Sequence, residues 1–250
     1  VPWANAVSDQ GEQGTCGPNM IYNAIGIVFN LMGQAFEVNR QALYNMYLIE
    51  NGVAGRDIGV NPQLFAQTLE RLGVTEHTEI DYGLSHINEV PSQVTYTDAA
   101  THTLDLERMV VDGQNQEQLI RILGNKLLEG KPLLLYYTVM SDFMGQHGPL
   151  SEQPGDNFAS YAGGHAVAIT GVDTANNMLT VASWGEQYGD RLMMAAGLRI
   201  GELKSLQEMA KNEVIATSAL MRPPTATAGR NFTKINWNPG ANNPGLINPD

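Results

Sequence analysis

The sequence of 250 residues has a single cysteine and few basic residues. With one thiol the chain cannot form an internal disulfide, which is compatible with a reducing compartment but does not exclude export. Its 14 Lys and Arg residues face 26 Asp and Glu residues, and the formal net charge is −12. Because phosphate backbones are bound by clustered cations, this balance argues against a nucleic-acid partner.

Long apolar runs are also lacking. No run approaches the roughly 20 residues that span a bilayer, and no basic segment leads into an apolar one at the start. We therefore expect a soluble protein without a membrane partner. The sequence leaves the compartment open and is compatible with an intracellular or a virion-associated protein. No spacing of His, Cys and carboxylates forms a ligand set with the lone cysteine or a neighbouring histidine, so we expect no metal and no cofactor.

Apolar periodicity predicts helices in the N-terminal half. We expect them over 18–31, over 40–50 before Asn51-Gly52, and over 62–72 before Gly73. Residues 76–113 show no clear period and are assigned loosely to loops and short strands. A further amphipathic helix is expected over 115–129.

The second half is expected to be rich in strands. Residues 132–139 form an apolar run of strand length, and 165–172 with 178–183 are joined by a turn-rich link, which predicts an antiparallel hairpin that brings position 182 close to His165. The segment 221–250 is crowded with Pro, Asn and Gly and has too few apolar residues for a core. We expect it to be an extended or disordered arm that docks on a neighbouring subunit.

Cys16 and His165 are the candidate reactive pair. Cys16 follows a Gly-rich turn and begins an apolar helical run, where the positive end of the helix would lower the pKa of its thiol. His165 opens a strand after two glycines. A lone cysteine with a distant histidine is the pattern of a thiol nucleophile and its base, whereas the alternative is a small buried residue at a helix start.

Acyl transfer also needs a donor for the developing oxyanion. A side-chain amide just before the nucleophile can act together with the cysteine N–H. Gln10 and Gln13 both qualify, and spacing alone does not separate them.

Three segments in order resemble papain-like cysteine peptidases, of a bacterial or viral type. They are Gln10-Gly-Glu-Gln-Gly-Thr-Cys16, Gly164-His165-Ala-Val-Ala-Ile-Thr-Gly171 and Ser183-Trp184-Gly-Glu-Gln-Tyr-Gly-Asp190. The resemblance covers about residues 1–195. It implies an α+β, papain-like two-lobe fold within a domain of residues 1–220, with a helical lobe over about 10–112, an antiparallel β-rich lobe over about 113–220, and the active-site cleft between them.

The resemblance also implies roles for individual residues. Cys16 would be the nucleophile, His165 its proton-transfer partner and Gln10, rather than Gln13, the oxyanion donor. Trp184 and Ser183 would support the histidine. Residues near the substrate would be Gly59, Val60, Gly164 and Ala166, with Gly59 and Val60 pairing with the substrate backbone.

The pattern departs from the family at Ala182, where the family has the asparagine that orients the histidine ring. Alanine offers no hydrogen bond, so activity would persist at a reduced rate, another group would substitute, or the fold would serve binding alone. We expect a thiol-dependent endopeptidase acting on peptide or protein substrates. The alternatives are an impaired interaction module of a larger assembly, such as a virion, and a Cys–His acyl transferase.

Overall fold

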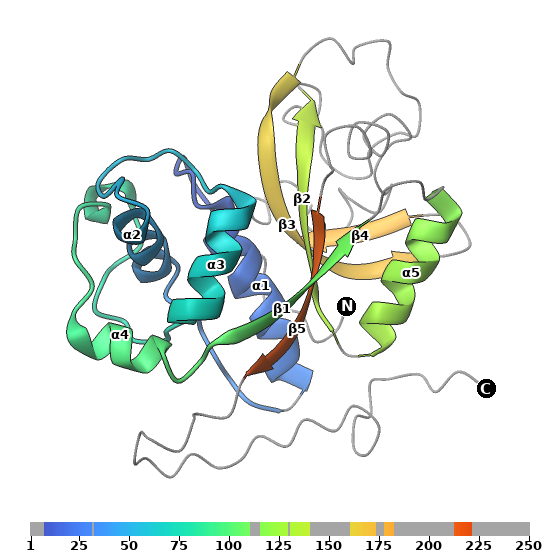
Figure 1. Cartoon of the computed structure of the whole chain (residues 1–250), viewed down its shortest axis with the longest axis horizontal. Helices are drawn as coiled ribbons and strands as arrows, with labels where there is room; N and C mark the ends of the chain where they lie inside the picture. Colours follow the sequence, from blue (N-terminus) through green and yellow to red (C-terminus); the bar gives the residue numbers. More distant parts are fainter. Residues whose placement is uncertain are drawn as a thin grey trace.

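The computed structural model of the chain describes residues 8–31, 33–110, 116–129, 131–140, 161–173, 178–182 and 213–221. Figure 1 shows helices α2, α3 and α4 to the left, helix α1 crossing the strands β1 and β5 in this view, and helix α5 to the right. Among the described residues, no helix is both long enough and apolar enough to cross a membrane.

The helical part has the helices that the sequence predicts. They are α1 (Cys16–Leu31), α2 (Arg40–Glu50) and α3 (Pro62–Leu72). Two short elements follow them, the 3-10 helix η1 (Leu84–His86) and helix α4 (Gln93–Ala99). The side chain of Asn39 caps α2, and that of Asn61 caps α3 by accepting from the N–H groups of Gln63 and Leu64. Capping satisfies N–H groups that have no partner inside the helix, which explains why the predicted bounds of α2 and α3 are confirmed.

Helix α4 was not predicted. It has seven residues and lies in the stretch that we assigned to loops and short strands. Its Thr- and Val-containing sequence has low helix propensity, but the Ser92 side chain caps it by accepting from the N–H of Thr95. Thr95 and Ala99 of this helix are buried, so tertiary packing adds to the cap in stabilising the element.

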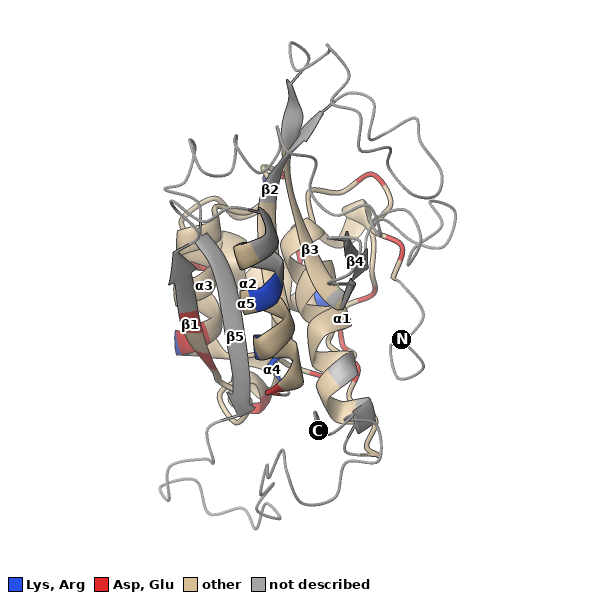
Figure 2. Cartoon of the chain, turned by 90° about the vertical axis from the view of Figure 1, so that its right-hand side faces the viewer, with Lys and Arg blue, Asp and Glu red and all other residues tan. Residues whose placement is uncertain are grey.

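Within the described residues the sheet has five strands in the order β1-β5-β2-β3-β4, and all of these neighbours are antiparallel (Figure 2). The strands are β1 (Leu104–Val110), β2 (Leu133–Met140), β3 (Tyr161–Asp173), β4 (Met178–Ala182) and β5 (Glu213–Met221), and helix α5 (Gln116–Leu128) precedes β2. The predicted hairpin of β3 and β4 is confirmed. Strand β5, which was not predicted, lies between β1 and β2 and joins two segments far apart in the sequence.

One apolar core connects the helices to the sheet. Helices α1, α2 and α3 contribute Met20, Ile21, Ile25, Leu43, Tyr44, Leu48, Phe65 and Leu69, and the strands contribute Leu104, Leu134, Ala166 and Ala168. Helix α1 packs against β3 and β2. This packing brings the first residue of α1 to the middle of β3, and so positions the candidate site.

Candidate active site

Cys16 is the first residue of α1. The N–H of Asn19 donates to the carbonyl oxygen of Thr15 at 3.0 Å and closes the first helical turn. At this end of a helix the N–H groups lack intrahelical partners and carry partial positive charge. Cys16 is partly buried and packs against the core.

The thiol of Cys16 lies beside strand β3. The main-chain N–H of Ala166, the residue after His165, is close enough to stabilise a Cys16 thiolate. Tyr136 of the neighbouring strand β2 is also near, since burial and then the charge of a Cys16 thiolate raise the pKa of its hydroxyl. The fold therefore brings Cys16 to the part of β3 that carries His165.

Burial dominates the electrostatics of both groups. It raises the pKa of the Cys16 thiol, while the N–H groups of Ala166, Gly17 and Cys16 itself act in the opposite direction and the carboxylate of Asp57 raises the pKa further. His165 is only 4% exposed, and burial lowers the pKa of its imidazole to about 3. Near neutral pH this structure thus favours a neutral thiol and a neutral imidazole.

Gln10 is buried, and one atom of its side chain is fixed. Its Nε2 donates to the carbonyl oxygen of Gln13 at 2.8 Å. Because a side-chain amide has two N–H groups, this bond orients the amide and leaves a second N–H for another acceptor. Gln13 is equally buried, and its Oε1 has no hydrogen-bond partner among the described residues.

A loop at residues 57–60 holds the turn before Cys16 from one side. The Oδ1 of Asp57 accepts from the N–H of Gly14 at 2.9 Å and from the hydroxyl of Tyr44 at 2.8 Å, and the N–H of Gly59 donates to the same hydroxyl at 3.0 Å. The sequence did not single out Asp57 or Tyr44 for the site. The Asp57-Ile-Gly-Val segment was the available signal, whereas Tyr44 has the spacing of an ordinary core residue on α2.

The four candidate substrate-binding residues lie in different surroundings. Gly59 adopts a φ of 73°. Val60 lies close to Gly17, since a Cβ added to Gly17 would lie 2.7 Å from the Cγ2 of Val60. Ala166 is buried, at 3% exposure. Gly164 is exposed, and a Cβ on it would meet no atom within 4 Å.

The expectation that position 182 lies close to His165 is wrong in register. The backbone of Ala182 pairs with Ala168, three residues after His165, and a register shift lies between Ile169 and Gly171. Strand register is set by the position of the connecting turn and by bulges, which the sequence did not reveal here. Ser183, Trp184 and the arm 222–250 lie outside the described residues.

No protein-family model matches the chain, and no curated protein sequence matches it. Solved structures do. Xylellain, a cysteine protease from Xylella fastidiosa, has a TM-score of 0.60 and 22% identity, covering 76% of this chain and 75% of its own.

Two further solved structures, from a plant and from a trypanosome, also match. A Carica candamarcensis cysteine protease in complex with E-64 has a TM-score of 0.55 and 18% identity, covering 86% of this chain and 93% of its own. A procathepsin B from Trypanosoma congolense has a TM-score of 0.56 and 15% identity, covering 80% and 70%. Helices packed on an antiparallel sheet, with these structural matches, show that the chain has the α+β papain-like fold.

Proposed function

We propose that the protein is a thiol-dependent endopeptidase in which Cys16 is the nucleophile and His165 the proton-transfer partner. One observation carries the proposal. The thiol at the N-terminus of α1 lies against the main chain of Ala166, next to His165 on β3. The papain-like fold supports it, because the structures that share this fold include cysteine proteases.

The reaction begins with attack on a peptide carbonyl. The sulfur forms a bond to the carbonyl carbon, the thiol proton passes to His165, and the carbonyl π electrons move to the oxygen. The N–H of Cys16 and the remaining N–H of Gln10 stabilise this oxyanion. Collapse of the intermediate breaks the C–N bond, and His165 protonates the leaving amine. Water then hydrolyses the thioester.

Burial decides when charge separates. Since both groups are held neutral, the thiolate and imidazolium form as the substrate is attacked, and the imidazole acts as a general base. The negative charge on the Cys16 sulfur then develops next to the N-terminus of α1 and the N–H of Ala166, and both stabilise it.

We place the substrate backbone along Gly59 and Val60. Both residues are partly buried, and an extended peptide would bind the accessible part of their main chain as an added strand. Gly164 leaves open space beside His165, and that space would accommodate the substrate near the reacting carbonyl.

The test combines labelling with hydrolysis. As Cys16 is the sole cysteine, any thiol adduct maps to it. We expect a peptidyl chloromethyl ketone to label the native protein once and faster than the urea-unfolded chain, and a peptide mixture to be cleaved by the wild type but not by Cys16→Ala or His165→Gln. If the native protein is labelled no faster than the unfolded chain and cleaves no peptide, the endopeptidase proposal is wrong, and the result supports an interaction module without activity. Incorporation of an added amine in place of hydrolysis would indicate an acyl transferase.

A further inference from the structure

The turn before Cys16 is held on its other side by Tyr82 and Arg40. We propose that Tyr82 is a positioning residue whose hydroxyl ties the two ends of this turn together and thereby orients the Gln10 amide toward the oxyanion. The role in catalysis rests on the proposed endopeptidase function.

Three groups converge on the Tyr82 hydroxyl. It donates to the carbonyl oxygen of Gln10 at 2.9 Å and accepts a hydrogen bond from the Nδ2 of Asn19 at 3.1 Å. It also lies 2.5 Å from the Oγ1 of Thr15. A phenol has one proton to donate, so Thr15 is the donor in the last pair. The hydroxyl thus connects the start of the turn to its end and to the first turn of α1.

Arg40 fixes the orientation of the Tyr82 ring. Its guanidinium carbon lies 4.0 Å from the ring centroid, within the range of a cation–π contact. Its Nη1 donates to the carbonyl oxygen of Asp9 at 2.9 Å and to the Oδ1 of Asn19 at 2.6 Å. Arg40 is the first residue of α2, where the helix dipole disfavours a cation. Its contacts with the turn offset that cost.

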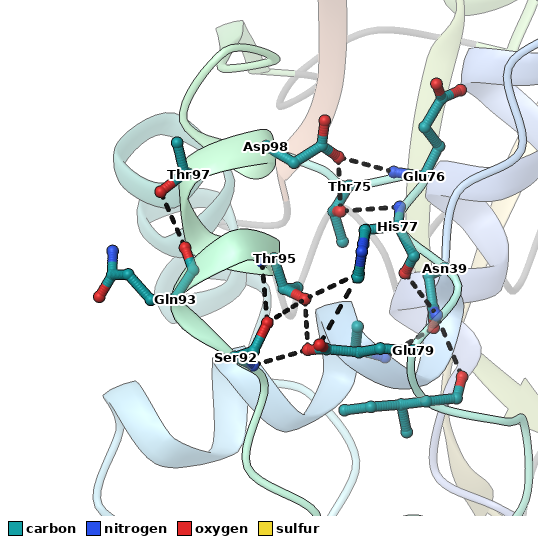
Figure 3. A network of polar contacts seen from close by, with 12 residues as sticks. Asn39, Thr75, Glu76, His77, Glu79, Ser92, Gln93, Thr95, Thr97 and Asp98 are labelled. Carbon is teal, nitrogen blue, oxygen red and sulfur yellow. Dashed lines mark hydrogen bonds and ion pairs between the residues drawn. The ribbon is translucent and has the colours of Figure 1, made fainter.

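The segment that carries Tyr82 is itself anchored. The Nδ2 of Asn39 donates to the carbonyl oxygen of His77 at 2.9 Å. The Glu79 carboxylate accepts from the N–H of Ser92 at 2.6 Å and from the Thr95 hydroxyl. Figure 3 shows these contacts as dashed lines. The segment is therefore fixed between the start of α2 and the start of α4. These bonds hold the main chain near Tyr82 in place, and the Tyr82 hydroxyl in turn holds the turn before Cys16.

Two contacts orient Gln10, so that the second N–H of its side-chain amide faces the proposed oxyanion position. Its carbonyl oxygen is held by Tyr82, and one N–H of its side chain is held by the carbonyl of Gln13. Removing the Tyr82 hydroxyl frees the main chain of Gln10 from Thr15, while the ring still stacks on Arg40. The loss should weaken stabilisation of the oxyanion and leave the thiol in place.

The experiment compares Tyr82→Phe with Tyr22→Phe. Tyr22 also lies against the Arg40 guanidinium, at 5.2 Å, but among the described residues its hydroxyl makes no hydrogen bond to the turn. Both are assayed for hydrolysis of a fluorogenic dipeptide amide, for inhibition by the matching peptide aldehyde and for alkylation by iodoacetamide. The aldehyde forms a hemithioacetal whose oxygen occupies the oxyanion position, whereas alkylation only replaces iodide at carbon.

We expect Tyr82→Phe to lower kcat and aldehyde affinity about tenfold, less than the loss of a whole oxyanion donor. KM and the iodoacetamide rate should stay within about twofold, as a hydrogen bond lost outside the substrate site predicts. Tyr22→Phe should match the wild type. Equal kcat and aldehyde affinity in the two variants, or a parallel loss of iodoacetamide reactivity, would overturn the proposal.

Amide hydrogen exchange separates this inference from the proposed function. If the wild type neither cleaves peptides nor binds the aldehyde, the endopeptidase proposal fails, and exchange at residues 11–16 decides the positioning role. Faster exchange there in Tyr82→Phe than in Tyr22→Phe supports it, and equal exchange refutes it. If Tyr82→Phe does not fold, Thr15→Val removes the hydroxyl that contacts Tyr82, and the same assays are applied to that variant.

Discussion

Gly14→Ala should damage the site through one steric contact. A Cβ on Gly14 would lie 2.7 Å from the nitrogen of Gly59 and 2.8 Å from the Oδ1 of Asp57. The backbone of Gly14 does not have a positive φ, so alanine would be compatible with its conformation and only the contact opposes it. The nitrogen belongs to the main chain and cannot rotate away as a side chain would.

The size of the effect follows from the displacement. To restore an ordinary contact of 3.4 Å, the turn and the loop at 57–59 must separate by about 0.7 Å. Overpacking of this kind costs about 1–3 kcal/mol of stability. Since a misplacement of about 1 Å costs on the order of 100-fold in rate, we expect kcat to fall ~10- to 100-fold.

Gly164→Ala is the matched control for stability. That Cβ meets no atom within 4 Å, so the free energy of unfolding should stay within about 0.5 kcal/mol of the wild type. Urea denaturation and peptide hydrolysis of both variants check the prediction. A Gly14→Ala protein as stable and as active as the wild type would refute the steric reasoning.

Three further changes test the electrostatics and capping. Asp57→Asn keeps an oxygen that can accept from Gly14 but removes a charge that raises the pKa of Cys16, so the pH profile of iodoacetamide alkylation should move to lower pH; an unchanged profile would contradict this. Asn61→Ala removes the α3 cap and should cost about 1 kcal/mol in urea denaturation, and no loss would exclude a capping role. Burial lowers the pKa of the His165 imidazole to about 3, whereas in the unfolded chain the imidazole binds a proton below about pH 6.5. The wild type should therefore lose up to about 1.4 kcal/mol per pH unit between pH 6.5 and 3 relative to His165→Gln, and equal slopes would disprove the burial argument.

Ala182 gives the remaining test of the site. If the missing amide limits the rate, Ala182→Asn should raise kcat for peptide hydrolysis by orienting the imidazole. Because the backbone of Ala182 pairs with Ala168, three residues beyond His165, the reach of the new side chain along the strand decides the outcome. An unchanged kcat would show that the lack of an amide at position 182 does not limit the rate, because another group orients His165 or because the new side chain does not reach it.

Local signals determined much of the fold. The ends of α2 and α3 were predictable from Asn51, Gly52 and Gly73 because turn residues of this kind act within a few residues. The β3–β4 hairpin was predictable from its turn-rich link for the same reason. Helix α4 and strand β5 were not, because a short helix of low propensity and a strand between two distant partners depend on packing.

The sequence by itself determined which groups could react: one thiol, its helix, a histidine on a strand and an amide six residues before the thiol. Only the tertiary structure decided that Asp57, Tyr44 and Tyr82 hold the turn and that desolvation favours the neutral form of both reactive groups. The reason is physical. Helix ends and turns depend on neighbours along the chain, whereas desolvation and hydrogen bonds between residues tens of positions apart exist only after the chain has folded.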